Sequence, residues 1–256
     1  MRKPIVFAIL TALAAGSPLA HSADNDVLKF SAYPFDTRSA RSATPAHFSR
    51  QADNQAGLRL VQFTGAVKQS WLAELRARGV VPVQYIASHG YLVWSDDAAT
   101  PRLADLHRTA AWLQYDAPFE GFLKLDPMLA ASVAAGTDAE IDVTVQIYAH
   151  DGDAATRTFV ESLGVLPASQ QAPLGSGTAS YQWAPILAFA NLALRVRVAD
   201  IPALAERADV TFVGARLPTT LMDEKQALLL SGDPAPGPAS PSYLDFLAGR
   251  GFSTNP

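Results

Sequence analysis

A short alternation of strand-type and helix-type segments constrains the fold of this chain more than any other feature. Strand segments carry apolar residues at every second position, whereas helix segments carry them three or four residues apart. Between residues 58 and 115 the order is strand, helix, strand, strand, helix, strand. The segments are Leu58–Phe63, Gln69–Arg78, Val80–Ile86, Tyr91–Trp94, Pro101–Ala110 and Trp112–Tyr115. This order predicts a ferredoxin-like unit, in which both helices cover one face of a four-stranded antiparallel sheet.

Residues that begin and end helices agree with these segments. Gly79 follows the first helix and is typical of a helix end, since glycine readily adopts a positive φ. Thr100 is predicted to cap the second helix, with Pro101 at its first position. A tight turn at Ser88-His89-Gly90 is expected to join the second and third strands as a hairpin.

The same order recurs further along the chain. Apolar residues alternate in a strand from Ile141 to Ile147, and a helix is predicted over Ala154–Leu163. A strand over Asn191–Val198, a short helix over Ile201–Arg207 capped by Asp200, and a last strand over Val210–Gly214 follow. The missing second strand is expected between residues 164 and 191, lengthened by a loop around residues 170–177. We therefore predict an α+β fold of two tandem ferredoxin-like domains, with a single larger α+β domain as the alternative.

The predicted helices leave the second face of the first sheet for solvent or for a partner. Most aromatic residues of this domain must lie in its core, but alternation should place some of them on the open face. These residues are Trp71, Tyr85, Tyr91, Trp94, Trp112 and Tyr115. An exposed apolar sheet face is typical of a protein-binding surface.

The N-terminal residues resemble a secretory signal. Arg2 and Lys3 precede an apolar run from Ile5 to Ala15, and small residues then predict cleavage after Ser22 or after Ala23. A membrane anchor is the alternative, but the apolar run is short for a hydrocarbon core of about 30 Å. We expect a bacterial periplasmic or secreted protein, with no membrane association once the signal is removed.

The sequence divides into six segments. We predict a signal peptide (residues 1–22), a flexible leader (23–56), a first domain (57–118), a connector (119–140) and a second domain (141–230). Residues 231–256 are expected to form a linker and the start of a catalytic domain that is missing here. The linker prediction rests on four prolines and two glycines between Ser231 and Pro241.

Composition excludes several kinds of site. The 256 residues contain no cysteine, which excludes disulfides, thiolate zinc sites, iron–sulfur clusters and a cysteine nucleophile. A formal net charge of −4, or −6 without Arg2 and Lys3, argues against a nucleic-acid partner, which normally requires a basic surface. We predict neither a cofactor nor a metal.

Residues that could perform catalysis do not form a recognisable set. The five histidines, His21, His47, His89, His107 and His150, lack metal-ligand spacing and are interpreted as solvated surface residues. The pairs Asp96-Asp97 and Asp151-Gly152-Asp153 are interpreted as helix starts rather than as a catalytic dyad or a calcium loop. We therefore expect that this chain is not an enzyme.

A resemblance adds to this interpretation. It rests on several hydrophobic spacings and on a C-terminal segment: Leu60-Val61-Gln62-Phe63, Trp71 to Val80, Tyr85 to Val93, Trp112 to Tyr115, Lys124-Leu125, Ala208 to Val213 and Ser242 to Phe252. In these the chain resembles the N-terminal propeptide region of secreted bacterial subtilisin-like serine proteases (the peptidase S8 family). The resemblance implies inhibitor-like modules of ferredoxin-like fold, which act as intramolecular chaperones and temporary inhibitors of the protease domain.

The sequence departs from this family at the catalytic motifs. It has no Asp-Thr-Gly, no His-Gly-Thr-His and no Gly-Thr-Ser, so no catalytic Asp, His or Ser is carried over to this chain. The first hypothesis is a propeptide region without its catalytic domain, whose partner is that domain in cis or in trans. A stand-alone exported protease inhibitor or protein-binding module is the alternative. The segment from Tyr243 to Phe252 favours the precursor, because no partner for it is evident in the sequence.

Overall fold

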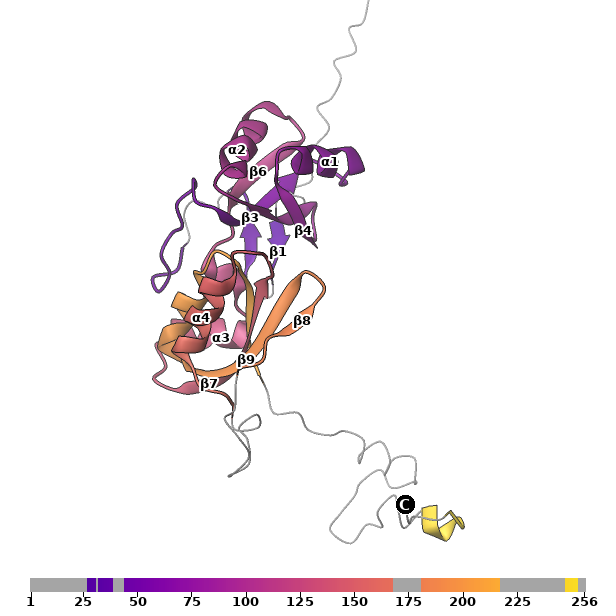
Figure 1. The fold of residues 1–256 in the computed structure, drawn as a ribbon, viewed down its shortest axis with the longest axis vertical. Coiled ribbons are helices and arrows are strands. Elements are labelled where there is room, and N and C mark those ends of the chain that lie inside the picture. Colours follow the sequence, from indigo (N-terminus) through magenta and orange to yellow (C-terminus); the bar gives the residue numbers. More distant parts are fainter. Residues whose placement is uncertain (1–26, 31, 39–43, 168–180, 217–246, 253–256) are drawn as a thin grey trace, which may run out of the picture. The chain divides into compact units, whose positions relative to one another are not determined.

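A computed structural model describes residues 27–30, 32–38, 44–167, 181–216 and 247–252 of the chain (Figure 1). Residue contacts divide the chain into two units, Met1–Arg216 and Leu217–Pro256. In the second unit, residues 247–252 form one helical turn, closed by hydrogen bonds from the amides of Arg250 and Phe252 to the carbonyl of Leu247 (3.0 and 3.1 Å). The first unit contains both predicted sheets and is an α+β structure with antiparallel sheets.

The first sheet contains the predicted strands and helices in the predicted order. Its elements are β3 (Gly57–Phe63), α1 (Gln69–Ala77), β4 (Val81–Ile86), β5 (Gly90–Ser95), α2 (Ala99–Thr109) and β6 (Leu113–Pro118). All pairings are antiparallel, and the strands lie side by side in the order β4-β5-β3-β6. Gly79 has a φ of +83°, which confirms its predicted role as the residue that ends α1.

The start of α2 corrects one sequence prediction. Thr100 is not the cap, because the helix begins one residue earlier, at Ala99. The Asp96 carboxylate accepts hydrogen bonds from the amides of Ala98 and Ala99 (3.0 and 2.7 Å), so it satisfies the free N–H groups at this helix start. The Thr100 hydroxyl is buried instead and lies 2.9 Å from the Ser95 hydroxyl.

The second sheet repeats the arrangement. Its elements are β7 (Glu140–Tyr148), α4 (Ala154–Leu163), β8 (Ala184–Ile186), β9 (Phe189–Arg197), the 3-10 turn η4 (Val198–Asp200), α5 (Ile201–Ala205) and β10 (Val210–Ala215). The strands lie in the order β10-β7-β9-β8. When the strands of each sheet are numbered from one to four along the chain, both sheets have the spatial order 4-1-3-2. The predicted loop around residues 170–177 lies outside the described residues.

The connector between the sheets contains two helical elements that the sequence did not predict. These are the 3-10 turn η2 (Gly121–Lys124) and the helix α3 (Pro127–Ala134). The Asp126 carboxylate caps α3 by accepting a hydrogen bond from the Leu129 amide (2.8 Å), and Pro127 occupies the first helical position.

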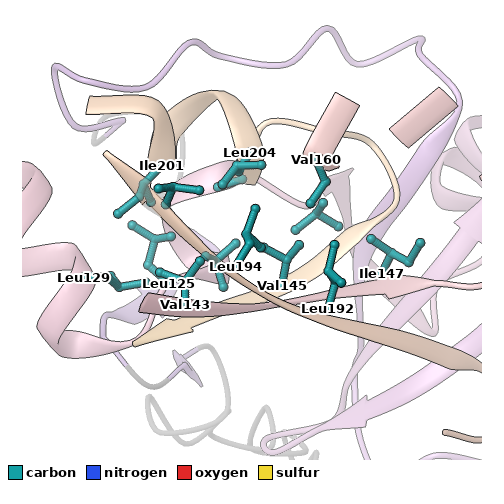
Figure 2. Packing of buried hydrophobic residues seen from close by; sticks show 14 of the residues in the cluster. Leu125, Leu129, Val143, Val145, Ile147, Val160, Leu192, Leu194, Ile201 and Leu204 are labelled. Carbon is teal, nitrogen blue, oxygen red and sulfur yellow. The ribbon is translucent and has the colours of Figure 1, made fainter. Parts of the chain in front are cut away.

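Helices cover one face of each sheet. In the second sheet, Val143, Val145 and Ile147 of β7 alternate with partly exposed residues and point toward the helices. Figure 2 shows Val160, Ile201 and Leu204 from α4 and α5 above the strand residues. In the first sheet, α1 and α2 pack in the same way on Val61, Val93 and Leu113, beside a stack of Phe63, Trp71 and Trp112.

The opposite face of the first sheet is not open, which corrects the sequence prediction. A second cluster of buried side chains fills this face, with Leu58 and Leu60 of β3 and Leu92 of β5 on the sheet side. It is covered by η2 and by an N-terminal hairpin, β1 (Val27–Lys29) paired with β2 (Pro34–Asp36). The covering side chains are Leu28, Phe35, Phe119, Phe122 and Leu123. Consequently β3 is buried at all seven of its residues.

Two expectations about this region were therefore wrong. The leader (residues 23–56) is not separate from the fold in its described part, because Leu28 is fully buried, Phe35 is 7% exposed, and Phe48 packs against the same cluster. Some of six aromatic residues were expected on an open face, but the two that lie on this side of the sheet, Trp94 and Tyr115, pack in the covered cluster. Burial raises the pKa of the Tyr115 phenol well above its usual range.

The N-terminal hairpin is expected to contribute to stability. Leu28→Ala should lower the free energy of unfolding by about 2–4 kcal/mol, because it removes a fully buried side chain from the covered face. Urea unfolding followed by circular dichroism measures this value. Leu187→Ala is the matched control, since Leu187 is 98% exposed and its truncation should change stability by less than about 0.5 kcal/mol. Equal, small effects of the two variants would show that the hairpin does not hold the sheet.

Candidate functional site

The second sheet differs from the first in that the face away from its helices is partly exposed. We call this surface the outer face. Its side chains come from alternate positions of β7 and β9 and from β10. They are Asp142, Thr144, Gln146, Asn191, Ala193, Arg195 and Phe212. In the strand register, Asp142 lies opposite Arg195, Thr144 opposite Ala193 and Gln146 opposite Asn191.

Charge on the outer face is balanced by an ion pair across the two central strands. Arg195 donates two hydrogen bonds to the Asp142 carboxylate, from Nε (2.6 Å) and Nη2 (3.1 Å). These bonds raise the pKa of the Arg195 guanidinium. The two side chains are 38% and 27% exposed, so solvent screens the pair and its contribution to stability is small. The pair therefore serves to hold two charged groups in fixed positions at the surface.

Phe212 places an aromatic ring on the same face. The register between β10 and β7 shifts between Val210 and Phe212, so that Val210 and Val213 both point inward while Phe212 points outward. Its ring lies over Gly214, where a Cβ atom would be 2.5 Å from the ring. The side chain is 37% exposed. The bulge thus leaves an apolar group, flanked by polar residues, partly exposed at the surface.

The edge of the second sheet beside β10 is closed. Leu125 pairs with Val213 in a parallel bridge, and the Asp126 amide donates to the Val213 carbonyl (3.1 Å). The Asp126 carboxylate in turn accepts from the Ala215 amide. Because these groups occupy the free edge of β10, a partner cannot extend the sheet there by adding a strand.

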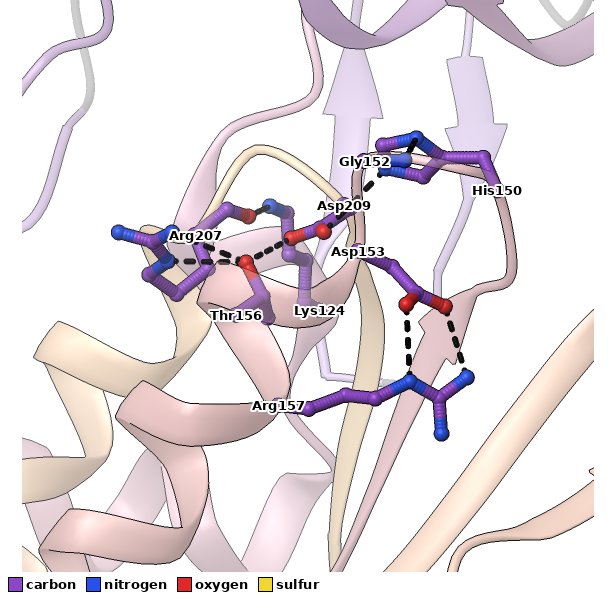
Figure 3. Close-up of polar contacts among 8 residues, drawn as sticks. All are labelled: Lys124, His150, Gly152, Asp153, Thr156, Arg157, Arg207 and Asp209. Carbon is purple, nitrogen blue, oxygen red and sulfur yellow. Dashed lines mark hydrogen bonds and ion pairs between the residues drawn. The ribbon is translucent and has the colours of Figure 1, made fainter.

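A buried polar cluster lies where the connector, β7 and β10 meet (Figure 3). Lys124, 1% exposed, donates from Nζ to the Arg207 carbonyl (2.8 Å). Thr156 donates from Oγ1 to the Asp209 carboxylate (2.6 Å) and accepts from Nε and Nη2 of Arg207 (3.1 and 3.0 Å). These bonds join the connector to α4 and to the loop before β10.

His150 lies at the border of this cluster. The sequence had suggested a solvated surface histidine, and that interpretation is wrong. The His150 ring packs at a tilt against Trp94 of the first sheet, with 4.2 Å between the ring centroids. The Gly152 amide donates to Nδ1 (3.1 Å), and Nε2 is buried, 3.4 Å from Asp209 Oδ2, without a hydrogen bond of good geometry. Since Nδ1 is engaged by a backbone amide and Nε2 faces a carboxylate, neither nitrogen is available to activate a hydroxyl nucleophile. The cluster is therefore a structural junction.

The other candidate residues of the sequence do not form a site. Ser22 and Ala23, the predicted signal-cleavage residues, lie outside the described residues. Asp153 begins α4 and is held by a two-point ion pair with Arg157 (2.9 and 2.7 Å). That ion pair lowers the pKa of the Asp153 carboxyl group. Within the described part of the chain, no group of three or more His, Asp or Glu side chains has a geometry suited to a metal ion.

Sequence reasoning missed Lys124 and the outer face. Lys124 is the one charged residue in the short apolar run from Phe122 to Leu125, which in retrospect signals a buried lysine. No sequence motif marks the outer face. Its exposure depends on which of the two similar sheets is left uncovered in the folded chain. Among the described residues, no helix is long and apolar enough to cross a bilayer.

Comparison with known proteins gives one family without an assigned function. Residues 28–118 are similar to a family described as a domain of unknown function (DUF8729). The match begins within β1 and ends at the last residue of β6, so it includes the N-terminal hairpin together with the sheet that the hairpin covers. No curated protein and no solved structure matches the chain.

Lys124 makes stability depend on pH. Burial lowers its pKa to about 7, against the opposing effect of nearby carboxylates, chiefly Asp209. The unfolded chain, in which a lysine titrates near 10.4, therefore holds one more proton than the folded chain between pH 7 and pH 10. The free energy of unfolding should consequently rise from pH 7 to pH 9.5, by up to about 3 kcal/mol from this group.

Urea unfolding of Lys124→Met at both pH values tests this contribution. The variant should lose the rise that wild type shows between pH 7 and pH 9.5. Lys68→Met, at an exposed lysine, is the control and should retain the rise. If Lys124→Met and wild type change in parallel with pH, the buried lysine is not the titrating group.

Proposed function

We propose that this chain is an exported binding module of the propeptide type found in subtilisin-like protease precursors, and that it binds the protease catalytic domain through the outer face. One observation carries the proposal. The chain itself covers both faces of the first sheet, whereas the second sheet is covered by helices on one face and leaves the other partly exposed. In this proposal the chain assists and inhibits a protease and is not an enzyme.

We propose further that each sheet with its α-helices forms a ferredoxin-like unit. The support is that both sheets show the same connection of strands and helices and the same spatial order 4-1-3-2. The two units then have different roles. The first is a closed module that holds the second in place, and the second presents its outer face to the protease.

The proposed chaperone action is explained by the slow folding expected of the protease domain. Folds that depend on contacts between distant residues form slowly, because loop closure costs entropy before the contacts form. A rigid sheet face binds and orders part of such a fold during its formation. Residues that follow β10 in the sequence would then reach the substrate cleft and compete there with substrate.

Inhibition of a subtilisin-like protease tests the outer face. The chain from Ala23 to Pro256 is expected to inhibit, and Thr144→Arg should weaken inhibition by about tenfold, because it places a bulky charge at the centre of the interface. Thr158→Arg is the matched control, since Thr158 is exposed on α4 and belongs to the helix layer. Steady-state inhibition constants for the three proteins give the comparison.

Two outcomes would contradict this assignment. Equal inhibition by the two threonine variants would exclude the outer face as the binding surface. Absence of inhibition by wild type, together with no effect on refolding of the denatured protease, would remove the proposed function. Inhibition without any acceleration of refolding would instead support the alternative, a stand-alone exported inhibitor.

A further inference from the structure

A cavity at one end of the outer face lies between the two sheets. Its volume is about 250 Å³. Gln146, Thr211 and Phe212 of the outer face form one wall, and Gln84 and Ile86 of β4 belong to the opposite wall. The cavity is therefore continuous with the surface that we propose binds the protease.

The floor of the cavity is apolar and the mouth is polar. Leu92, Phe119, Leu123 and Leu125 line the cavity and are each less than 5% exposed. Gln84 and Lys29 are exposed and lie nearer to solvent. Gln146, also at the mouth, accepts a hydrogen bond from the Thr211 hydroxyl (3.0 Å). The apolar surface that a ligand can reach comes from Phe30, Ile86 and Phe212, which are more exposed and line the cavity together with this nearly buried floor.

The size and charge of the cavity indicate what it accepts. A dry cavity of about 150 Å³ lined by Leu, Ile and Phe is enough to bind benzene, so a volume of 250 Å³ has room for one aromatic side chain. Lys29 is the charged residue among those that line the cavity. A carboxylate next to the aromatic side chain is therefore favoured over an ammonium group.

We propose that this cavity is the anchor site for an aromatic side chain of the partner protein that is adjacent in sequence to an acidic residue. This inference rests on the proposed function, because it names the chemistry by which the outer face selects its protein partner. Side chains that enter such desolvated pockets commonly provide most of the binding energy of an interface. The bulge in β10 contributes to this site, because it turns Phe212 toward the rim of the cavity.

The test uses short peptides, so it does not depend on any protease. N-acetyl-Asp-Phe-amide is titrated into the chain from Ala23 to Pro256, labelled with ¹³C at leucine methyl groups. The methyl signals of Leu92, Leu123 and Leu125 should shift with peptide concentration at millimolar affinity. N-acetyl-Asp-Ala-amide should leave them unchanged, and N-acetyl-Lys-Phe-amide should bind about threefold more weakly.

A charge reversal at the mouth gives the matched variant. Lys29→Glu should weaken binding of the Asp-Phe peptide by about threefold, whereas Lys68→Glu, at an exposed lysine away from the cavity, should leave it unchanged. No shift of the three leucines with the Asp-Phe peptide would overturn the inference, as would equal shifts with the Asp-Ala peptide. Protease inhibition without peptide binding refutes the anchor site alone, and peptide binding without protease inhibition refutes the proposed function alone.

Discussion

The structure depends on the burial of the first sheet between two apolar layers. β3 lies at the centre of this sheet and is buried at every residue, so its side chains require cover on both faces. On one face the cover comes from α1 and α2, and on the other from the N-terminal hairpin and η2. Because burial of apolar surface is the main stabilising contribution to folding, the hairpin and the connector are integral to this domain. The range of the DUF8729 match, which includes β1 and β2, agrees with this requirement.

The same covering layer fixes the first sheet against the second. The amide of Leu58, at the start of β3, donates to the carbonyl of Ala208 in the loop before β10 (2.9 Å). Gly57 has a φ of +149° and lies so close that a Cβ atom would be 2.9 Å from that of Ala208. Lys124 and Asp209 add buried polar bonds at the same place, which are costly to break because an unpaired buried group loses its solvation. The second sheet thereby presents its outer face from a fixed support.

Much of this fold was predictable from the sequence, and the remainder was not for identifiable reasons. Alternation predicted β7 and β9 because these strands are long enough to show a period of two, and β3 was predicted from its apolar run. The N-terminal hairpin was missed because each of its strands has three residues and one buried side chain, Leu28 or Phe35, which gives no periodicity. The place of His150 depends on Trp94, a distant residue that no local pattern connects with it. The outer face could not be predicted because exposure depends on what covers each sheet in three dimensions.

Hydroxyl-radical footprinting of the chain from Ala23 to Pro256 tests most directly the claim that one sheet is closed and the other open. The account predicts rapid oxidation of Phe212 and Tyr85, which are exposed, and little oxidation of Phe35 and Phe122, which are each 7% exposed. Addition of a subtilisin-like catalytic domain should then protect Phe212 and leave Tyr85 reactive. Oxidation of Phe35 and Phe122 at the rate of Phe212 in the free chain would show that the first sheet is open and would contradict the account.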